Sequence, residues 1–598
     1  MDGLRAIAVL AVVAFHAFPN RLAGGFIGVD VFFVISGYLI TGIIQADLAS
    51  GRFSALDFYA RRVRRIFPAL ILVLLATIAA GWRFLTPADY ALLGKHTIAG
   101  GLFSSNLLLW SEASYFDTAS ELKPFLHLWS LGVEEQFYLL WPLALAALSG
   151  RRHRTVLIVA VACASFAVNG ALSGGHPEAA FYLPFSRFWE LMVGAALASR
   201  AATLGSGSSA AGLALIAFSA VFMPAAGYPG WHALVPTVGT ALVILGGPAA
   251  RLNRFIAARP ILYIGLISYP LYLWHWPLLA LLRNYNPDHV SAMQKVGVVL
   301  VSFILAALTY HCVEKPLKKQ SFRKVAAALA FAMAAPLAFG ATLWGSDGVR
   351  DRWTGAQLAL IDDARRSKLE APADYRLHAC LLDHDQQFKD FAPECRRERA
   401  AAVLWGDSHA AHLVFGLRTV AISQLTSTLC PPILGYRSAK RPHCEATNQA
   451  IFESLRSPTT VILSAEWEEY IGDEKLIIQT LQKLRERGHH VILVGPSPSF
   501  SVEPLTVLLH EGVRDYVKSS NMDRLRRTES RLSAIAASLG VVFVPMLDKC
   551  GPEGCMVLEG RRLVYVDADH FSRLGAAIYG PRVIAALPIS PTALSGAL

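Results

Sequence analysis

Long apolar runs, confined to the first 345 residues, constrain this chain more than any other feature of its sequence. An α-helix needs about 20 mainly apolar residues to cross the ~30 Å hydrocarbon core of a bilayer. The 598 residues are 54% hydrophobic and 17% charged, with a mean hydropathy of +0.42, which excludes an ordinary soluble protein. We therefore predict a polytopic α-helical membrane bundle followed by a soluble part.

Eleven apolar runs are predicted to cross the membrane, the first of them retained and not cleaved. A further stretch, 91–110, is interrupted by glycine, serine and asparagine; if it does not cross, one side holds seventeen loop Lys and Arg and the other at most five. The positive-inside rule then places the N-terminus and Lys318 in the cytoplasm and Ser408 outside, with 91–110 re-entrant or interfacial. The net charge of +11 thus reflects topology and not nucleic-acid binding. The predicted spans are 3–19, 27–47, 67–85, 127–148, 155–173, 183–199, 209–226, 233–249, 261–282, 293–313 and 325–345.

The first span carries two polar residues, Arg5 and His16, in an otherwise apolar run. Eleven residues at ~100° each bring both side chains to one helix face, about 16 Å apart along the axis. Ionisable groups at that depth face a bundle interior or a wet cavity and indicate a functional site. The alternative is a neutral His16 that bonds a neighbouring carbonyl.

Several other spans also contain polar residues, which predicts a shared polar cavity. Single residues of this kind are usually structural contacts between helices. Arg187 and Glu190, three apart on one face, favour a structural ion pair over a catalytic one. The polar span residues include Asp30, Ser36, His127, Ser130, Glu134, Gln136, Arg187, Glu190, Tyr272 and His275.

Six of the eight cysteines lie in the soluble part and group in sequence as Cys380–Cys395, Cys430–Cys444 and Cys550–Cys555. An even, locally paired set predicts three disulfides and an oxidising compartment. Zinc binding is the competing interpretation, weakened because no Cys-x-x-Cys pair is present.

Beyond residue 400, apolar strands alternate with amphipathic helices. Such alternation predicts a parallel sheet with helices on both faces, a three-layer, flavodoxin-like α/β domain. The predicted strands are 401–407, 459–465, 490–496 and 541–547. The predicted domains are a membrane domain, 1–320, an additional transmembrane helix, 321–346, an extracytoplasmic connector, 347–400, and the α/β domain, 401–598.

Two short motifs in the α/β domain predict a nucleophilic site. Ser408, in Gly-Asp-Ser-His, follows a predicted strand, and His570 follows Asp567 by three residues after the last strand. These residue types supply the nucleophile, base and orienting carboxylate of a Ser-His-Asp triad. Asp569 is a rival orienter, although direct adjacency to His570 makes contact between them awkward.

The membrane part resembles the acyltransferase 3 family over about residues 2–320. The motifs that carry the resemblance are the Arg–x10–His pattern, FFVISGYLI, RRVRRIFPA, HLWSLGVEEQFYLLWP and SYPLYLWHWP. That family moves acyl groups, commonly acetyl from cytoplasmic acetyl-CoA, onto extracytoplasmic glycans. The resemblance therefore implies acetyl-CoA as donor, no metal, and a location in the bacterial cytoplasmic membrane.

The same resemblance assigns roles to residues of the membrane part. His16 is expected to be the catalytic imidazole, Arg5 to help bind or position the donor, and Glu134 to orient or share a proton with His16. A cluster of arginines is expected to bind CoA phosphates, since guanidinium binds phosphate bidentately; positive-inside flanking is the alternative. The cluster is Arg61, Arg62, Arg64 and Arg65.

The soluble part, over about 400–590, resembles the SGNH hydrolase-like domain found fused behind acyltransferase 3 domains. Ser408, His570 and Asp567 correspond to its triad. Gly435 corresponds to its oxyanion glycine, and the backbone N–H of Ser408 is expected to be a second oxyanion donor. The Gly-x-Asn-Asp block of typical SGNH enzymes is absent, and LSAEWEEY, 463–470, stands in its place. An oxyanion donor worth roughly 3 kcal/mol is therefore unaccounted for.

Three functions fit these patterns. In the first, the membrane part brings acetyl groups outward and Ser408 transfers them to a glycan hydroxyl, with O-antigen or another lipid-linked surface polysaccharide expected ahead of peptidoglycan. In the second, the membrane part completes the transfer and the SGNH-like domain binds or edits glycan. In the third, the chain is a transporter with a periplasmic domain, although paired halves are not recognisable. The expected partners are the bilayer and a glycan, without nucleic acid.

Overall fold

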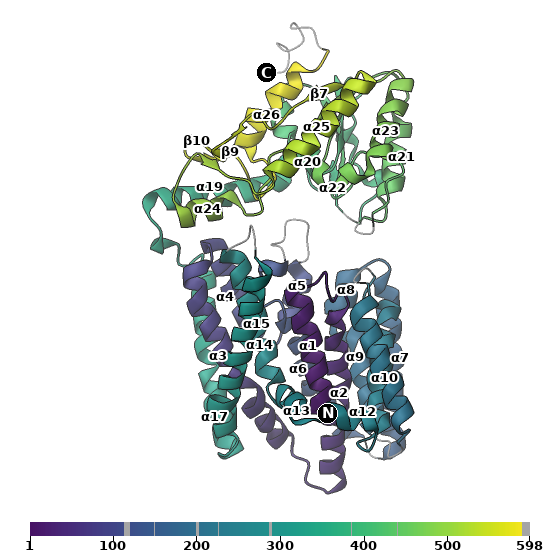
Figure 1. The fold of residues 1–598 in the computed structure, drawn as a ribbon, viewed down its shortest axis with the longest axis vertical. Coiled ribbons are helices and arrows are strands. Elements are labelled where there is room, and N and C mark those ends of the chain that lie inside the picture. Colours follow the sequence, from purple (N-terminus) through teal and green to yellow (C-terminus); the bar gives the residue numbers. More distant parts are fainter. Residues whose placement is uncertain are drawn as a thin grey trace. The chain divides into compact units, whose positions relative to one another are not determined.

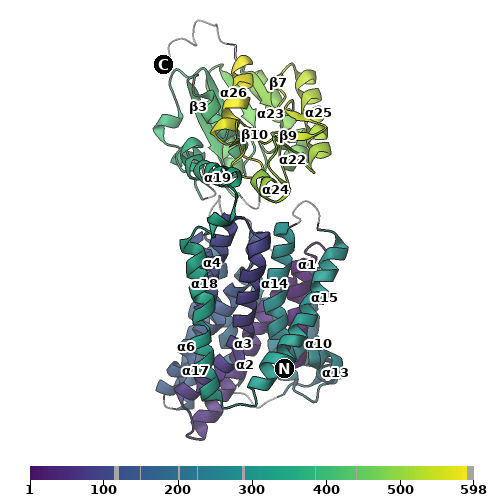
Figure 2. The ribbon, with the colours of Figure 1, turned by 90° about the vertical axis from the view of Figure 1, so that its left-hand side faces the viewer.

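The computed structural model describes residues 1–112, 120–148, 150–198, 203–224, 227–285, 290–383, 385–438 and 441–588. The chain forms two compact units, Met1–Val349 and Arg350–Leu598. The first unit is a bundle of helices, and the second is built on a sheet with helices packed against it (Figures 1 and 2).

Each predicted span coincides with helical structure in the first unit. Among the described residues, five helical stretches are long and apolar enough to cross a membrane, and the α13–α14 pair, bent by 64°, would make a sixth. The other predicted spans fall on α1, α6, α9, α10 and α11, which have 13 to 20 residues. The count of eleven therefore stays a prediction. The helices are α1 (Asp2–Ala17), α2 (Gly28–Ala49), α3 (Ala55–Phe84), α4 (Pro87–Gly101), α5 (Ser105–Glu112), α6 (Leu128–Ala147), α7 (Arg151–Ser173), α8 (Pro177–Tyr182), α9 (Pro184–Ala198), α10 (Ser206–Phe222), α11 (Leu234–Gly246), α12 (Arg251–Ile256), α13 (Arg259–Leu266), α14 (Ser268–Tyr285), α15 (Ala292–Leu308), α16 (Lys315–Leu317), α17 (Phe322–Ala332) and α18 (Ala334–Gly345).

Loops predicted to lie on the cytoplasmic side contact one another. Arg323, after α16, pairs with Asp57 at the start of α3, with 2.7 Å between Nε and Oδ1. The backbone N–H of Arg251 donates to Ser206 Oγ at 3.2 Å and joins the loops on either side of the α10–α11 pair. Basic loops that meet at one end of the bundle are what the predicted topology requires.

Helix α4 covers most of the ambiguous stretch 91–110. Its 15 residues extend about 22 Å, which is shorter than the ~30 Å hydrocarbon core. It packs closely on α18, since a Cβ added to Gly94 would lie 2.6 Å from the carbonyl oxygen of Gly340. The chain then breaks at Phe103, which has a φ of 55°, before α5 begins. The predicted spans α9 and α11 are no longer than α4, so the re-entrant assignment of 91–110 stays a prediction.

The second unit has a six-stranded parallel sheet in the order β1-β3-β2-β4-β5-β7. Four of these strands lie where the alternation of apolar segments predicts them: β2 (Ala402–Gly406), β4 (Thr460–Ser464), β5 (His490–Val494) and β7 (Val542–Val544). The remaining helices and strands are α19 (Gly355–Asp374), β1 (Leu381–Leu382), α20 (Ser408–Ala411), β3 (Ile422–Ser427), α21 (Cys444–Ser454), α22 (Trp467–Tyr470), α23 (Glu474–Glu486), α24 (Pro504–Glu511), β6 (Tyr516–Val517), α25 (Met522–Leu539), β8 (Cys550–Gly551), β9 (Gly554–Met556), β10 (Leu558–Glu559), β11 (Arg562–Leu563) and α26 (Arg573–Ala585).

Alternate residues of the central strands enter two separate cores. Leu404 and Ile462 pack with α19 and α26, whereas Val403, Trp405 and Leu463 pack with α21, α23 and α25. Because successive side chains of a strand point to opposite faces, the sheet is covered on both sides. The predicted three-layer architecture is thus confirmed.

The sheet extends beyond the strands that apolar runs predict. Strand β3 reads ISQLTS, and its polar side chains are buried because they are bonded: Gln424 donates to the Tyr375 carbonyl at 2.9 Å and Thr426 to the Cys380 carbonyl at 2.8 Å. The stretch 347–400, expected to be a connector, contributes α19 and β1 to the second unit.

All three predicted disulfides are present in the second unit. Cys380–Cys395 and Cys430–Cys444 each have 5.4 Å between Cα atoms, and Cys550–Cys555 has 3.9 Å. The first anchors β1, and the last joins the paired strands β8 and β9. Their local pairing is the one that sequence order indicates.

Candidate functional site

Ser408 and His570 meet at the carboxyl end of β2. Ser408 begins α20 directly after the strand, and its Oγ lies 2.9 Å from His570 Nε2. Nδ1 of His570 lies 3.0 Å from Asp567 Oδ2, and both backbone N–H groups of the 569–570 turn donate to Asp567 Oδ1. The structure therefore brings the three predicted triad residues together, with Ser408 and His570 buried.

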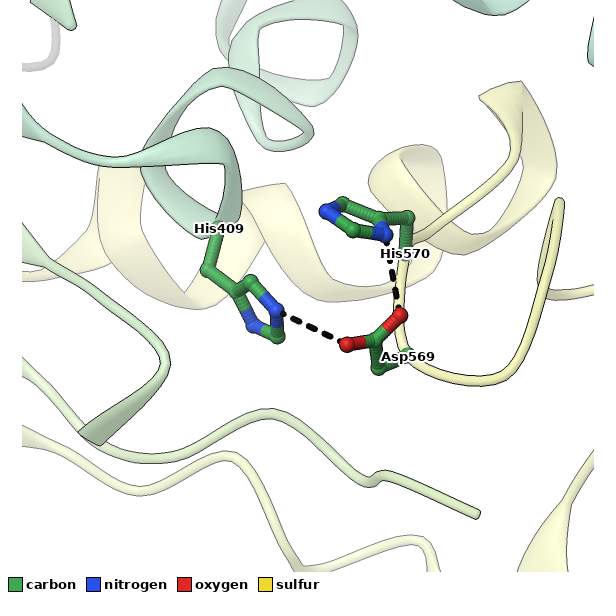
Figure 3. Close-up of side chains that lie close together, drawn as sticks. All are labelled: His409, Asp569 and His570. Atoms are coloured by element: carbon green, nitrogen blue, oxygen red, sulfur yellow. Dashed lines mark ion pairs between the residues drawn. The ribbon is translucent and has the colours of Figure 1, made fainter. Parts of the chain in front are cut away.

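Asp569 also contacts His570, although their adjacency was expected to make contact awkward (Figure 3). Its Oδ1 lies 2.9 Å from His570 Nδ1, and its Oδ2 lies 3.5 Å from Nε2 of His409. Asp567 caps a tight turn that directs the side chains of Asp569 and His570 toward α20, so that the two can touch. Two carboxylates thus serve one imidazole.

His409 is a site residue that the sequence argument did not assign, although it stands next to Ser408 in the motif. It is 2% exposed. Burial opposes its charge, but the carboxylates of Asp569 and Asp407 together raise the pKa of His409 to about 9. Burial likewise favours a neutral Asp569, yet the imidazoles of His570 and His409 hold the pKa of Asp569 well below its usual range.

His409, Asp569 and His570 offer donor atoms that lie within 4.8 Å of one another, the spacing of a metal-ligand set. Nδ1 of His570 is already bonded to Asp567, and Asp569 pairs with both imidazoles. We therefore interpret the cluster as a chain of ion pairs that belongs to the triad.

Two segments bear on the predicted oxyanion donors, the loop that carries Gly435 and the segment that carries Glu466. Gly435 is exposed in the loop after β3, with a φ of 78°, and the side chain nearest to a Cβ added there is Leu476, at 3.8 Å. Glu466, in the segment that replaces the asparagine block, donates its backbone N–H to Asp407 at 3.0 Å. Burial raises the pKa of Glu466 to about 7.

In the helical unit, His16 lies beside His275 of α14. Nδ1 of His16 is 2.9 Å from Nε2 of His275, and the Trp276 ring packs edge-on against the His16 ring. Arg283 donates to the carbonyl of His16 at 2.8 Å. His16 lines a cavity of about 250 Å³ together with Asp30 and Arg187, which form an ion pair at 3.0 Å.

A second cavity, of about 220 Å³, contains Arg5, Arg62 and Arg65 together with Glu134 and Glu135. Glu134 accepts a hydrogen bond from Ser36 here, so it does not share a proton with His16 as expected. Glu134, on α6, lines the cavity with the arginines of α3 and lies away from the end of α1 that carries His16.

The arginine cluster of α3 divides between two faces of the helix. Arg62 and Arg65, three residues apart, line the cavity. Arg61 instead pairs with Asp47 at 3.0 Å, and Arg64 donates to the Gln320 carbonyl at 3.0 Å. Of the arginines expected at the donor site, Arg5, Arg62 and Arg65 therefore lie at the cavity, and Arg61 and Arg64 bond elsewhere.

The two cavities share Val29 and Tyr272 in their walls. The Tyr272 hydroxyl donates to the His127 carbonyl at 2.8 Å and lies 2.6 Å from Ser130 Oγ. Arg5 and His16, on one helix, thus border different cavities that adjoin at Tyr272.

Comparison with known proteins agrees with this two-part arrangement. Residues 1–311 match a family described as acyltransferase domain, and residues 379–585 match one described as SGNH domain (fused to AT3 domains). Relatives include peptidoglycan O-acetyltransferase OatA of Listeria monocytogenes, 31% identical over 54% of this chain and 56% of that protein. O-acetyltransferase OatA of Staphylococcus aureus is 29% identical over 54% of this chain and 58% of that protein.

The chain thus spans about half the length of these curated relatives. The solved periplasmic domain of the Salmonella ser. Paratyphi A lipopolysaccharide acetyltransferase matches with a TM-score of 0.34 and 17% identity, over 39% of this chain and 98% of that one. The acyltransferase-domain match alone covers more than half of the sequence. The chain therefore belongs to the acyltransferase-domain family, and an SGNH domain of the kind fused to AT3 domains follows its helical domain.

Proposed function

We propose that this protein is an acetyl-CoA-dependent O-acetyltransferase of the bacterial cytoplasmic membrane that acetylates hydroxyls of an extracytoplasmic glycan. The observation that carries the proposal is the pair of cavities that adjoin at Val29 and Tyr272. One cavity has cations suited to a phosphorylated donor, and the other has an imidazole suited to acyl transfer.

Arg5, Arg62 and Arg65 support donor binding at the first cavity. Guanidinium groups bind phosphate oxygens bidentately, and hydrogen bonds between charged groups are about twice as strong as neutral ones. The side chain of Arg62 is also held by Glu135, at 3.6 Å, and over the Tyr138 ring. In this proposal the arginines hold the CoA phosphates, and the thioester extends toward Tyr272 and the His16 cavity.

The Ser408 site then completes the transfer. Ser408 Oγ attacks the acetyl carbonyl carbon while His570 Nε2 takes its proton. The bond from that carbon to its carrier, the CoA sulfur or an acetylated His16 nitrogen, breaks, and the carrier leaves with the proton. A glycan hydroxyl next attacks the acyl-serine, gives its proton to His570, and releases Ser408 as the proton returns. Asp567 and Asp569 stabilise the imidazolium in both steps. The bound glycan has to exclude water, because hydrolysis competes at an open serine site.

For the acceptor we propose a lipid-linked surface polysaccharide such as O-antigen, with peptidoglycan as the second candidate. Peptidoglycan is the acceptor in the name of the Listeria relative. A second function deserves a test because the asparagine block is replaced by LSAEWEEY: the helical unit completes the transfer, and the SGNH domain only binds or edits the glycan.

The test uses the full chain reconstituted in lipid vesicles, with acetyl-labelled acetyl-CoA and either lipid-linked polysaccharide or peptidoglycan fragments. We expect label on the glycan from wild type, and none from His16→Ala or Ser408→Ala. His311→Ala and Ser538→Ala, at positions outside both sites, are the matched controls and should retain activity. Transfer by Ser408→Ala at the wild-type rate would favour the second function, and no donor-dependent transfer by wild type would overturn both.

A further inference from the structure

His275 is fully buried in α14, and its ring is held at both nitrogens. Nδ1 lies 2.7 Å from the carbonyl oxygen of Tyr272, one turn earlier. A carbonyl oxygen can only accept a hydrogen bond, so Nδ1 of His275 must carry the proton. In a neutral imidazole the other nitrogen, Nε2, then presents a lone pair.

The lone pair of His275 faces His16. Its Nε2 lies 2.9 Å from Nδ1 of His16, and the two rings lie within 9° of parallel. Two unprotonated nitrogens would repel at this distance, so Nδ1 of His16 must donate. In neutral His16 the remaining nitrogen, Nε2, is therefore unprotonated.

The surroundings favour two neutral rings. Among the described residues, no carboxylate forms an ion pair with His16 or His275. The groups that contact the two rings include the side chains of His127, Trp276 and Phe15, and Arg283 bonds the carbonyl of His16. The carboxylates of Asp30 and Glu121 line the same cavity as His16, where they pair with Arg187 and Arg283. An imidazolium at this depth would lie next to the Arg283 cation, and the carboxylates of the same cavity already pair with arginines. A charged ring is therefore costly here, within a membrane bundle.

We propose that His275 is a positioning residue that holds His16 in its Nδ1–H tautomer, so that Nε2 of His16 is the reactive nitrogen. The consequence for catalysis rests on the role proposed above for His16. As a general base or as a transient acyl carrier, His16 needs a free lone pair, and a histidine held in the wrong tautomer loses most of its catalytic power. Nδ1–H of His16 donates to Nε2 of His275, and Nδ1–H of His275 donates to the carbonyl of Tyr272.

The kinetic test compares His275→Leu with His275→Gln in the reconstituted full chain. Glutamine can place Oε1, an acceptor, near the position of Nε2, whereas leucine fills the space without accepting. We expect His275→Leu to lower kcat about 10- to 100-fold at an unchanged KM for acetyl-CoA, and His275→Gln to restore most of the loss. His311→Leu, which removes a histidine bonded to Tyr263, is the control and should behave as wild type.

The second readout is the protonation of His16 itself, measured by nitrogen NMR on the histidine-labelled full chain in lipid. Signals lost in His16→Asn identify its ring nitrogens. We expect a protonated Nδ1 and a bare Nε2 in wild type and in His275→Gln, and a mixture in His275→Leu. A bare Nδ1 in wild type, or full kcat in His275→Leu, would overturn the proposal. Because the NMR readout needs no transfer activity, it separates this proposal from the proposed role of His16.

Discussion

Two carboxylates on one imidazole distinguish the serine site at the residue scale. Asp567 accepts a hydrogen bond from the backbone N–H of His570 and also contacts Nδ1 of the His570 ring. Asp569 contacts the same Nδ1 and, with its other oxygen, His409. In the proposed transfer, either carboxylate can stabilise the imidazolium that would form when Ser408 gives up its proton. The two should therefore substitute for each other in part.

We expect Asp567→Asn and Asp569→Asn each to retain more transfer activity than Ser408→Ala. The double variant should fall to the level of Ser408→Ala, because the members of a triad act as a unit and their losses do not add. Glycan acetylation at matched protein levels measures this. If Asp567→Asn alone were as inactive as Ser408→Ala, Asp569 would have no stabilising role.

The ion pair between His409 and Asp569 makes stability depend on pH. The pKa of His409 is raised to about 9, so its contribution is complete below the ordinary value of 6.5 and is lost as pH rises through about 9. The pKa of Asp569 is lowered, so its contribution is lost only in acid. Calorimetry of the full chain should show His409→Gln melting below wild type at pH 6 and near it at pH 10. An equal gap at both values would contradict this account.

At the scale of elements, α3 directs alternate arginines to different partners. Arg62 and Arg65 line the cavity with Arg5. Arg61 pairs with Asp47 of α2, and Arg64 bonds to the carbonyl of Gln320 in the loop after α16. We expect Arg65→Gln to raise the KM for acetyl-CoA about tenfold, the cost of one charged hydrogen-bonding group.

Arg61→Gln and Arg64→Gln are the matched controls for that measurement, since they remove the same charge from the other face of α3. Both should leave the KM within about twofold of wild type, the size expected of exposed ion pairs. Equal increases in all three variants would mean that the positive charge of this part of α3 acts as a whole, without a specific donor site.

For the whole molecule, the distribution of basic loops predicts that α16 and the second unit lie on opposite sides of the membrane. We expect a cysteine at Lys318 to be labelled only from the cytoplasm and one at the exposed Arg456 only from outside. The free cysteines Cys163 and Cys312 are first replaced by serine, because both are exposed. Labelling of both positions from one side would refute the eleven-span topology.

Much of the architecture followed from local pattern. Span positions, the alternation of strands and helices, the disulfide pairs and the types of triad residue depend on periodicity and spacing, which a sequence carries directly. Strand β3 was not predicted, because its Gln424 and Thr426 are polar. These side chains can be buried because they donate hydrogen bonds to the carbonyls of Tyr375 and Cys380.

Which residues meet across the bundle was decided by tertiary packing alone. His16 bonds His275, 259 residues away, and Glu134 faces the arginines of α3 and not His16. The rotation and depth of each helix against its neighbours determine such contacts, and neither is encoded in the period of a single helix. Local pattern was enough to predict polar residues inside the helix bundle and a serine site with two candidate carboxylates. The cavity that each polar group lines, and the contact of both carboxylates with one imidazole, depend on packing between distant segments.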